Sequence, residues 1–344
     1  MRSIVHRESG DPARVLRLEE TSDPVLATRQ VLVRTSYAPI HPGDLLGIQG
    51  SPAAGTPVII GPSGRVPGFE GAGVVVKVGR GVDRASGIKV GTRAAFFPAN
   101  SAWSEQVSVP AGSIVPLPEC VPDAIGAQML INTVTALTVL RAAYDSLSLD
   151  APEGVAVLVR AAGSAVGRLI VKLLMERGAF PVLLVRSETG AAALADVFPG
   201  VPAFATETDG WSDLVRAAVG DRRIHVAIDS VGGPLLGAVA DLLVDGIGTV
   251  VNFGSLGGDL SDIRIFAPRS LTLKGVMMAG WTRMPPEQRA RDVAVALRLA
   301  ARPAGLFDVA GYYEPSRIAE AAAHVAKPGK RGVVLLDFTE DGKG

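Results

Sequence analysis

The sequence predicts an α/β protein of two domains, one β-rich and the other built on a parallel sheet with helices on both faces. Three observations predict this class. The chain has 344 residues, more than one domain usually contains. Short apolar runs punctuated by glycine and proline fill residues 1–124, and strands alternate with amphipathic helices from residue 125. Hydrophobic residues make up 48% of the chain, enough to bury a sizeable core.

The first segment, residues 1–124, is expected to form short strands joined by turns. β-Branched and apolar residues favour strands at 31–35, 71–78 and 91–97. No long helical period appears in this segment. It is therefore predicted to be a compact β-rich domain.

Residues 125–270 change to alternating helices and strands, which is typical of a parallel sheet covered on both faces. The expected helices are 127–144, 166–177, 211–219 and 235–243, and the expected strands are 154–159, 182–185, 226–228 and 249–251. Residues 271–344 return to mixed character. There we expect helices at 286–300 and 316–326 and a strand at 332–338.

Composition narrows the classes of partner. The 34 basic and 34 acidic side chains give a net charge of zero, so neither nucleic acid nor an anionic membrane is expected to bind. We expect no membrane span, because no run of about 18 apolar residues stands out. The N-terminus also lacks the apolar stretch of a signal peptide, which favours a cytoplasmic location. Cys120 is the only cysteine, which excludes an internal disulfide.

A turn of small residues follows the first strand of the alternating segment. Its sequence is AAGSAVG at 161–167, and the three positions of the G-x-G-x-x-G fingerprint hold Ala162, Ser164 and Gly167. Small residues let the backbone approach a pyrophosphate, and the next helix presents free N–H groups to it. We therefore expect a dinucleotide contact from the turn residues Gly163, Ser164, Ala165, Val166 and Gly167. The alternative is an ordinary strand-to-helix turn.

The end of the next strand distinguishes the two nicotinamide cofactors. An enzyme specific for NAD usually has an acidic residue about 20 positions after the turn, where it binds the ribose hydroxyls. Here that position holds Arg186, followed by Ser187. A guanidinium pairs with a 2′-phosphate, so these two residues predict NADPH. The alternative is a solvated surface arginine.

Further motifs accompany the turn in a definite order along the chain. They are IHPGD at 40–44, IQG at 48–50, GFEGAG at 68–73, INTVTA at 131–136, DSVGG at 229–233 and GK at 329–330. Together they resemble the medium-chain dehydrogenase/reductase superfamily, and within it the zinc-independent branch of quinone reductases and trans-2-enoyl-thioester reductases. The resemblance spans nearly the whole chain. It implies a GroES-like catalytic domain, residues 1–124 and 271–344, with an inserted Rossmann domain, residues 125–270, and a cofactor site between them.

The resemblance also predicts that no metal is bound. Zinc alcohol dehydrogenases, the sister branch, hold their catalytic zinc at positions that correspond here to His41, Phe69 and Ile131, and two of these three side chains cannot bind zinc. His41 is then either a hydrogen-bonding group of the catalytic site or a structural residue. Of the four cysteines that the structural zinc lobe requires, only Cys120 exists.

The same resemblance implies roles for several polar residues. Asn132 is expected near the nicotinamide ribose or the substrate, with a helix cap as the alternative, and Thr135 would lie one turn further along that helix. Backbone at Gly254 and Ser255 would approach the nicotinamide. Lys330 is expected near the adenine-side phosphate, or else is simply solvated. Asp229 either contacts the ligand or hydrogen-bonds within the end of the sheet.

The implied activity is hydride transfer from NADPH to a small-molecule substrate. Candidate acceptors are the activated C=C bond of an enoyl thioester or enone, and a quinone, with His41 and Asn132 as catalytic residues. The tyrosine of the enoyl thioester reductases is replaced by Pro52, and their Gly-Phe-Trp element by Gly-Val-Met at 275–277, although Trp281 follows. Tyr37, His41 and Trp103 are candidate proton donors in its place.

Two further expectations complete the interpretation. The missing tyrosine leaves open a non-catalytic NADPH-binding sensor or interaction protein of the same fold. Residues 270–275 alternate like an edge strand, and members of this branch pair through that strand, so we expect a homodimer.

Overall fold

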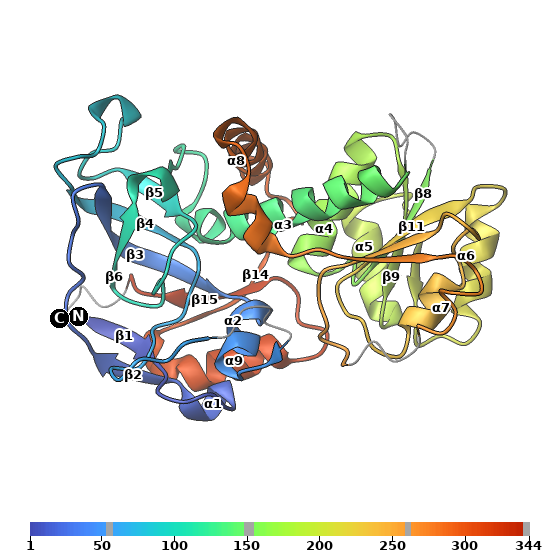
Figure 1. Ribbon diagram of the computed structural model, residues 1–344, viewed down its shortest axis with the longest axis horizontal. Coiled ribbons are helices and arrows are strands. Elements are labelled where there is room, and N and C mark those ends of the chain that lie inside the picture. Colours follow the sequence, from blue (N-terminus) through green and yellow to red (C-terminus); the bar gives the residue numbers. More distant parts are fainter. Residues whose placement is uncertain (53–57, 148–154, 259–262, 340–344) are drawn as a thin grey trace. The chain divides into compact units, whose positions relative to one another are not determined.

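The computed structural model describes residues 1–52, 58–147, 155–258 and 263–339. The chain forms two compact units, Met1–Ile131 with Pro285–Gly344, and Asn132–Met284 (Figure 1). The expected α/β class, a GroES-like sheet domain interrupted by a parallel-sheet domain, is confirmed. The expected limits, 124/125 and 270/271, fall earlier in the chain than these divisions, and the domain limits stay a prediction.

The first unit is built on a two-stranded antiparallel sheet and a larger, mostly antiparallel sheet. Its seven-stranded sheet has the order β14-β15-β3-β4-β5-β7, with β6 also paired to β3. The strands are β1 (Arg2–Val5), β2 (Arg17–Glu20), β3 (Gln30–Ile40), β4 (Gly71–Val78), β5 (Arg93–Phe96), β6 (Gln106–Pro110), β7 (Ile114–Pro116), β14 (Val309–Tyr313) and β15 (Val333–Asp337). β1 and β2 form a separate two-stranded sheet.

The C-terminal segment completes the sheet of the first unit. β15 pairs antiparallel with the second half of β3, from Tyr37 to Ile40, and parallel with β14. The helices of this unit are α1 (Pro12–Val15), α2 (Pro42–Ile48), α8 (Pro286–Ala300) and α9 (Ile318–Ala326), and α9 contacts α1 and α2 (Figure 1). The N-terminal and C-terminal segments therefore share one core.

The second unit contains a six-stranded parallel sheet. The strands are β8 (Ala156–Arg160), β9 (Phe180–Val185), β10 (Ala203–Ala205), β11 (Ile224–Asp229), β12 (Thr249–Asn252) and β13 (Thr272–Gly275). Their order is β10-β9-β8-β11-β12-β13, so the strand order reverses between β8 and β11. Every residue of β8 is buried, as expected for a central parallel strand covered on both faces.

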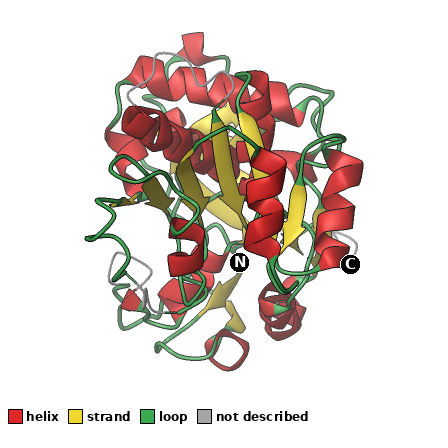
Figure 2. Ribbon diagram, turned by 90° about the vertical axis from the view of Figure 1, so that its right-hand side faces the viewer, coloured by secondary structure: helices red, strands yellow, loops and turns green. Residues whose placement is uncertain are grey.

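Helices flank this sheet, and Figure 2 shows them on both sides of its twisted strands. They are α4 (Ala165–Glu176), α5 (Glu188–Val197), α6 (Trp211–Val219) and α7 (Leu236–Ala240). The expected helix at 235–243 is shorter than predicted, and α5 and β10 were not predicted. Alanine and glycine fill α5, so its sequence lacks the apolar period of a typical amphipathic helix.

The long helix α3 (Asp123–Leu147) includes the point where the chain passes from the first unit to the second. By length and composition alone, one apolar window of this helix could cross a membrane. Polar residues at 132, 133 and 135 interrupt the apolar residues of this helix, and the expectation of no membrane span stays a prediction. However, 67% of that window is buried inside the protein, which is typical of a core helix.

Candidate functional site

The small-residue turn lies between a buried strand and the N-terminus of a helix. β8 ends at Arg160, and Ala161 adopts a left-handed backbone with φ of 55°. Ser164 caps α4, with its hydroxyl oxygen accepting from the Gly167 amide at 3.0 Å. A Cβ atom on Gly167 would lie 2.4 Å from the Ala161 carbonyl oxygen, so only glycine fits there. The turn thus has the strand-and-helix context that pyrophosphate binding requires.

Arg186 and Ser187 follow the next strand, β9. The Arg186 side chain is 55% exposed, and its Nε lies 3.4 Å from Oε1 of Glu207, which follows β10. The hydroxyl oxygen of Ser187 caps α5 by accepting from the Gly190 amide at 3.3 Å, which leaves its O–H free to donate. Sequence reasoning missed Glu207, because β10 was not predicted.

The ends of β11 and β12 carry a polar network. Asp229 accepts from the amides of Val231 and Gly232 at 2.9 and 3.0 Å, and Nδ2 of Asn252 lies 3.4 Å from it. Asp229 therefore hydrogen-bonds within the sheet end, which is one of the two expected roles. Arg160 lies 3.3 Å from the same carboxylate.

Gly254 and Ser255 follow β12 at the same edge of the sheet. A Cβ atom on Gly254 would lie 2.4 Å from the Ser230 carbonyl oxygen, so this backbone packs closely against the loop after β11. The carboxyl edge of one parallel sheet thus carries the turn, Arg186, Ser187, Gly254 and Ser255. Dinucleotides bind at this edge in open α/β folds.

Burial lowers the pKa of Arg160, and the neighbouring Asp229 opposes this shift.

A second cluster, in the first unit, consists of His41, Asp44 and Glu70. His41 precedes α2, and its amide donates to Oδ2 of Asp44 at 2.8 Å. Its ring Nε2 lies 2.8 Å from Oε1 of Glu70, and Oε2 of Glu70 accepts from the Ile131 amide at 2.8 Å. All three side chains of the cluster are buried. His41 is thus a hydrogen-bonding residue, with its Nε2 directed at protein.

Burial and mutual contact shift the titration of this cluster. Burial raises the pKa of Asp44 to about 6. Burial also raises the pKa of Glu70, against the opposing effect of His41. For His41, burial acts to lower the pKa, but the hydrogen bond to Glu70 and the charges of Glu70 and Asp44 outweigh it, so the pKa is raised.

Asn132 and Thr135 lie inside α3, at the start of the second unit. The alternative of a helix cap at Asn132 is therefore wrong, because the helix begins nine residues earlier, at Asp123. Asn132 is buried and Thr135 is half-buried. Positions three apart share one side of a helix, so both side chains lie on the same face.

Lys330 belongs to the first unit and is half-buried after α9. Its ammonium group donates to the Gly332 carbonyl, and its charge acts to lower the pKa of His41. It is therefore not a simply solvated lysine. The cofactor contact expected of it stays a prediction.

The chain is similar in sequence to several known proteins. Residues 27–119 match the alcohol dehydrogenase GroES-like domain. A mitochondrial enoyl-acyl-carrier-protein reductase of Caenorhabditis elegans is 29% identical over 82% of this chain and 79% of its own length. A Schizosaccharomyces pombe protein named as a probable quinone oxidoreductase is 27% identical over 76% of this chain and 74% of its own.

A solved structure matches over both units of the chain. It is a Bacillus thuringiensis protein provisionally described as an NADPH:quinone reductase, with a TM-score of 0.84, 26% identity and 98% of each chain covered. These similarities support the predicted resemblance to the medium-chain dehydrogenase/reductase superfamily. The relatives are quinone and enoyl reductases, which confirms the branch that the motifs predicted.

The sequence motifs predict that His41, Phe69 and Ile131 stand at the zinc-ligand positions of the sister branch, and this correspondence stays a prediction. The carboxylate beside Phe69, Glu70, is bonded to His41 and to the Ile131 amide. Across residues 1–52, 58–147, 155–258 and 263–339, no three His, Cys, Asp or Glu side chains are grouped to hold a metal ion. The side chains of His41 and Glu70 are therefore engaged with each other, and zinc independence stays a prediction.

The surroundings of Trp103 and Tyr37 affect the ability of each side chain to donate a proton. Trp103 is fully buried, and its Nε1 donates to the Pro39 carbonyl at 3.0 Å, so it is a core residue. Tyr37 is half-buried, and its ring lies 5.6 Å from that of Tyr312. Burial raises the pKa of Tyr37. Pro52 is exposed and carries no hydroxyl, whatever its position relative to a substrate.

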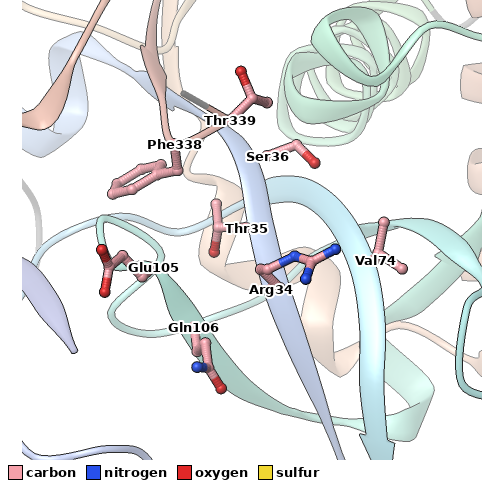
Figure 3. A pocket seen from close by; sticks show the side chains of 8 residues that line it. All are labelled: Arg34, Thr35, Ser36, Val74, Glu105, Gln106, Phe338 and Thr339. Atoms are coloured by element: carbon pink, nitrogen blue, oxygen red, sulfur yellow. The ribbon is translucent and has the colours of Figure 1, made fainter. Parts of the chain in front are cut away.

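A pocket on the first unit is lined by a different set of residues. It lies where β3 changes partner from β6 to β15. Figure 3 shows the side chains that line it, which are Arg34, Thr35, Ser36, Val74, Glu105, Gln106, Phe338 and Thr339. None of the predicted site residues is among them, so this pocket takes no part in the proposed chemistry.

Proposed function

We propose that this protein is an NADPH-dependent reductase that transfers hydride, without zinc, to an activated C=C bond of an enoyl thioester or enone, or to a quinone. The observation that carries the proposal is the carboxyl edge of the parallel sheet. It combines a tight turn at a helix N-terminus with Arg186 at the position where NAD enzymes carry an acid. The names of the quinone and enoyl reductase relatives support the same reaction class.

The residues of this edge divide the binding of the cofactor among them. Backbone N–H groups of the turn and the positive end of α4 would hold the pyrophosphate. Arg186 and Ser187 would bind the 2′-phosphate, with Glu207 released from Arg186 as the phosphate arrives. The glycine at 254 lets backbone come close to the nicotinamide ring. When bound, NADPH supplies the hydride.

The side chains of the protein would contribute to the reaction by stabilising the charge that develops on the substrate. Reduction of a conjugated carbonyl places negative charge on an oxygen, which a preorganised N–H donor stabilises. Asn132 is our proposed donor, because it is a buried amide on α3. His41 is the second candidate and Lys330 a further cofactor contact. Since Pro52 offers no hydroxyl, water is the proposed proton source.

A second candidate function is a non-catalytic NADPH-binding protein, and Pro52 at the tyrosine position favours it. One assay separates the two. NADPH oxidation is measured with a panel of enones, quinones and crotonyl thioesters, each with and without a metal chelator. We expect turnover on at least one class, unchanged by the chelator. NADPH binding without turnover on any substrate would support the second candidate, and chelator-sensitive turnover would contradict zinc independence.

Assembly and location belong to the same proposal. β13 is an end strand of the six-stranded sheet, so it offers an edge for a homodimer. A cytoplasmic location stays a prediction, since the enoyl reductase relatives are named as mitochondrial.

A further inference from the structure

The side chain of Arg160 bridges the two strands at which the order of the parallel sheet reverses. From the end of β8 its Nη1 donates to the Gly232 carbonyl at 2.6 Å. The same nitrogen lies 3.3 and 3.5 Å from the two carboxylate oxygens of Asp229, at the end of β11. Arg160 is 9% exposed and Asp229 is fully buried. The guanidinium is therefore held in one place at the edge of the sheet.

These contacts use only one of the three guanidinium nitrogens. Over the described part of the chain, Nε and Nη2 of Arg160 have no hydrogen-bond partner. Neither nitrogen is among the fully enclosed side-chain atoms that lack a partner, so both retain some exposed surface. Together they offer three N–H donors that the protein itself does not use.

The surroundings of these donors suit a phosphate group. Ala161 follows Arg160 directly, and three residues later Ser164 caps α4, a helix of 12 residues whose N-terminus carries partial positive charge. Dinucleotides cross an open parallel sheet where its strand order reverses, which here is between β8 and β11. Asp229 does not cancel the guanidinium completely, because its oxygens also accept from two backbone amides.

We propose that Arg160 is a cofactor-binding residue whose Nε and Nη2 donate to the pyrophosphate of the bound dinucleotide. Its Nη1 meanwhile fixes the loop after β11. The inference rests on the proposed function and adds a second cation to the cofactor site. Arg186 serves the phosphate on the ribose, and Arg160 serves the pyrophosphate.

Calorimetry with three ligands separates these two subsites. NADPH and 2′-phospho-ADP-ribose contain the pyrophosphate, whereas adenosine 2′-monophosphate does not. We expect Arg160→Met to raise the Kd of the first two ligands by about tenfold or more, and that of the third by less than twofold. The matched control, Arg186→Met, should weaken all three. Arg160→Lys should recover part of the loss, because it keeps the charge.

Steady-state kinetics gives an independent measurement. A pyrophosphate contact is the same before and during hydride transfer, so Arg160→Met should raise the KM for NADPH and leave kcat unchanged. If this variant does not fold, Arg160→Met with Asp229→Asn removes both buried charges, and the same ligands are compared. An unchanged Kd for 2′-phospho-ADP-ribose, or equal losses for all three ligands, would overturn the assignment. Failure of the wild type to bind NADPH would instead contradict the proposed function.

Discussion

Nε2 of His41 lies 2.8 Å from Oε1 of Glu70, and both side chains are buried. The second carboxylate oxygen of Glu70 accepts from the Ile131 amide, inside α3. One carboxylate therefore joins the start of α2, the segment before β4 and the middle of α3. These three segments are far apart in the sequence, so the pair stabilises the tertiary fold of the first unit.

Removal of His41 should therefore destabilise the protein more than neutralisation of Glu70. His41→Ala leaves a buried carboxylate without its ring partner, which costs about 3–5 kcal/mol of unfolding free energy. Glu70→Gln should cost less, because a neutral amide needs no opposing charge and keeps one oxygen to accept from Ile131. Urea denaturation at neutral pH measures both. A loss of under about 1 kcal/mol for His41→Ala would contradict a buried ion pair.

The pKa of Asp44 makes stability depend on pH. Its folded-state pKa is about 6, above the ordinary value of 3.8, so the fold favours protonated Asp44. This contribution is fully present below pH 3.8 and is lost as the pH rises through about 6. Across that window the wild type should lose about 3 kcal/mol relative to Asp44→Asn, which has no charge to bury.

Denaturant midpoints of the wild type and Asp44→Asn, measured at intervals from pH 3 to 8, follow this change. Because both proteins share every other titrating group, their difference isolates Asp44. A difference in unfolding free energy that does not vary with pH would show that Asp44 titrates normally.

Local signals predicted those elements whose ends are marked in the sequence. The bounds of β4, α6 and α8 agree with prediction, since Gly220 follows α6 and Pro286 begins α8. Long-range contacts were not predictable in this way. β3 continues through Pro39 to Ile40 because β15, some 300 residues away, pairs with it.

The same limit applies to the site. The turn at 161–167, Arg186 and Ser187 have local signatures, because small residues and a charge stand at fixed distances from a strand. Glu207 and Arg160 have none, and although Glu70 lies in the GFEGAG motif, nothing local identifies its partner. Each acquires its role from a partner on another element, namely His41, Arg186 and Asp229.

NADPH should bind at least tenfold more tightly than NADH. A charge-assisted pair between Arg186 and the 2′-phosphate contributes about 1.5–3 kcal/mol. Arg186→Asp should reverse or abolish the preference. Calorimetric titration of both cofactors measures it, and equal affinities for the wild type would refute the role of Arg186.

Glu207 should weaken this preference, because its Oε1 lies 3.4 Å from Nε of Arg186 and competes with the phosphate. Glu207→Gln should therefore tighten NADPH binding a few-fold and leave NADH binding unchanged. Asp213→Asn is the matched control, since Asp213 is also exposed and pairs with Arg216 instead. Equal effects of the two variants would show that general charge, rather than the contact, is responsible.

The end strand β13 should mediate a homodimer. Within the described residues it pairs with β12 alone, and unpaired edges favour association. Light scattering at micromolar concentration should give twice the chain mass. Thr272→Lys should dissociate the dimer, because two copies of the strand would bring like charges together, whereas Thr189→Lys on α5 should not. A monomer mass for the wild type would refute the prediction.

Among the side chains of α3, Asn132 should contribute most to turnover. As a buried amide it can donate to an oxygen that gains negative charge during hydride transfer, and one such donor is worth about 10²–10³ in rate. Asn132→Ala should lower kcat by that order and leave the Kd for NADPH within a few-fold.

Gln128→Ala is the matched control, because Gln128 is a buried amide on the same helix that donates to the Phe307 carbonyl of the first unit. His41→Ala should also lower turnover less than Asn132→Ala, since its ring is already engaged by Glu70. Full turnover of Asn132→Ala on every substrate that the wild type reduces would show that the donor lies elsewhere.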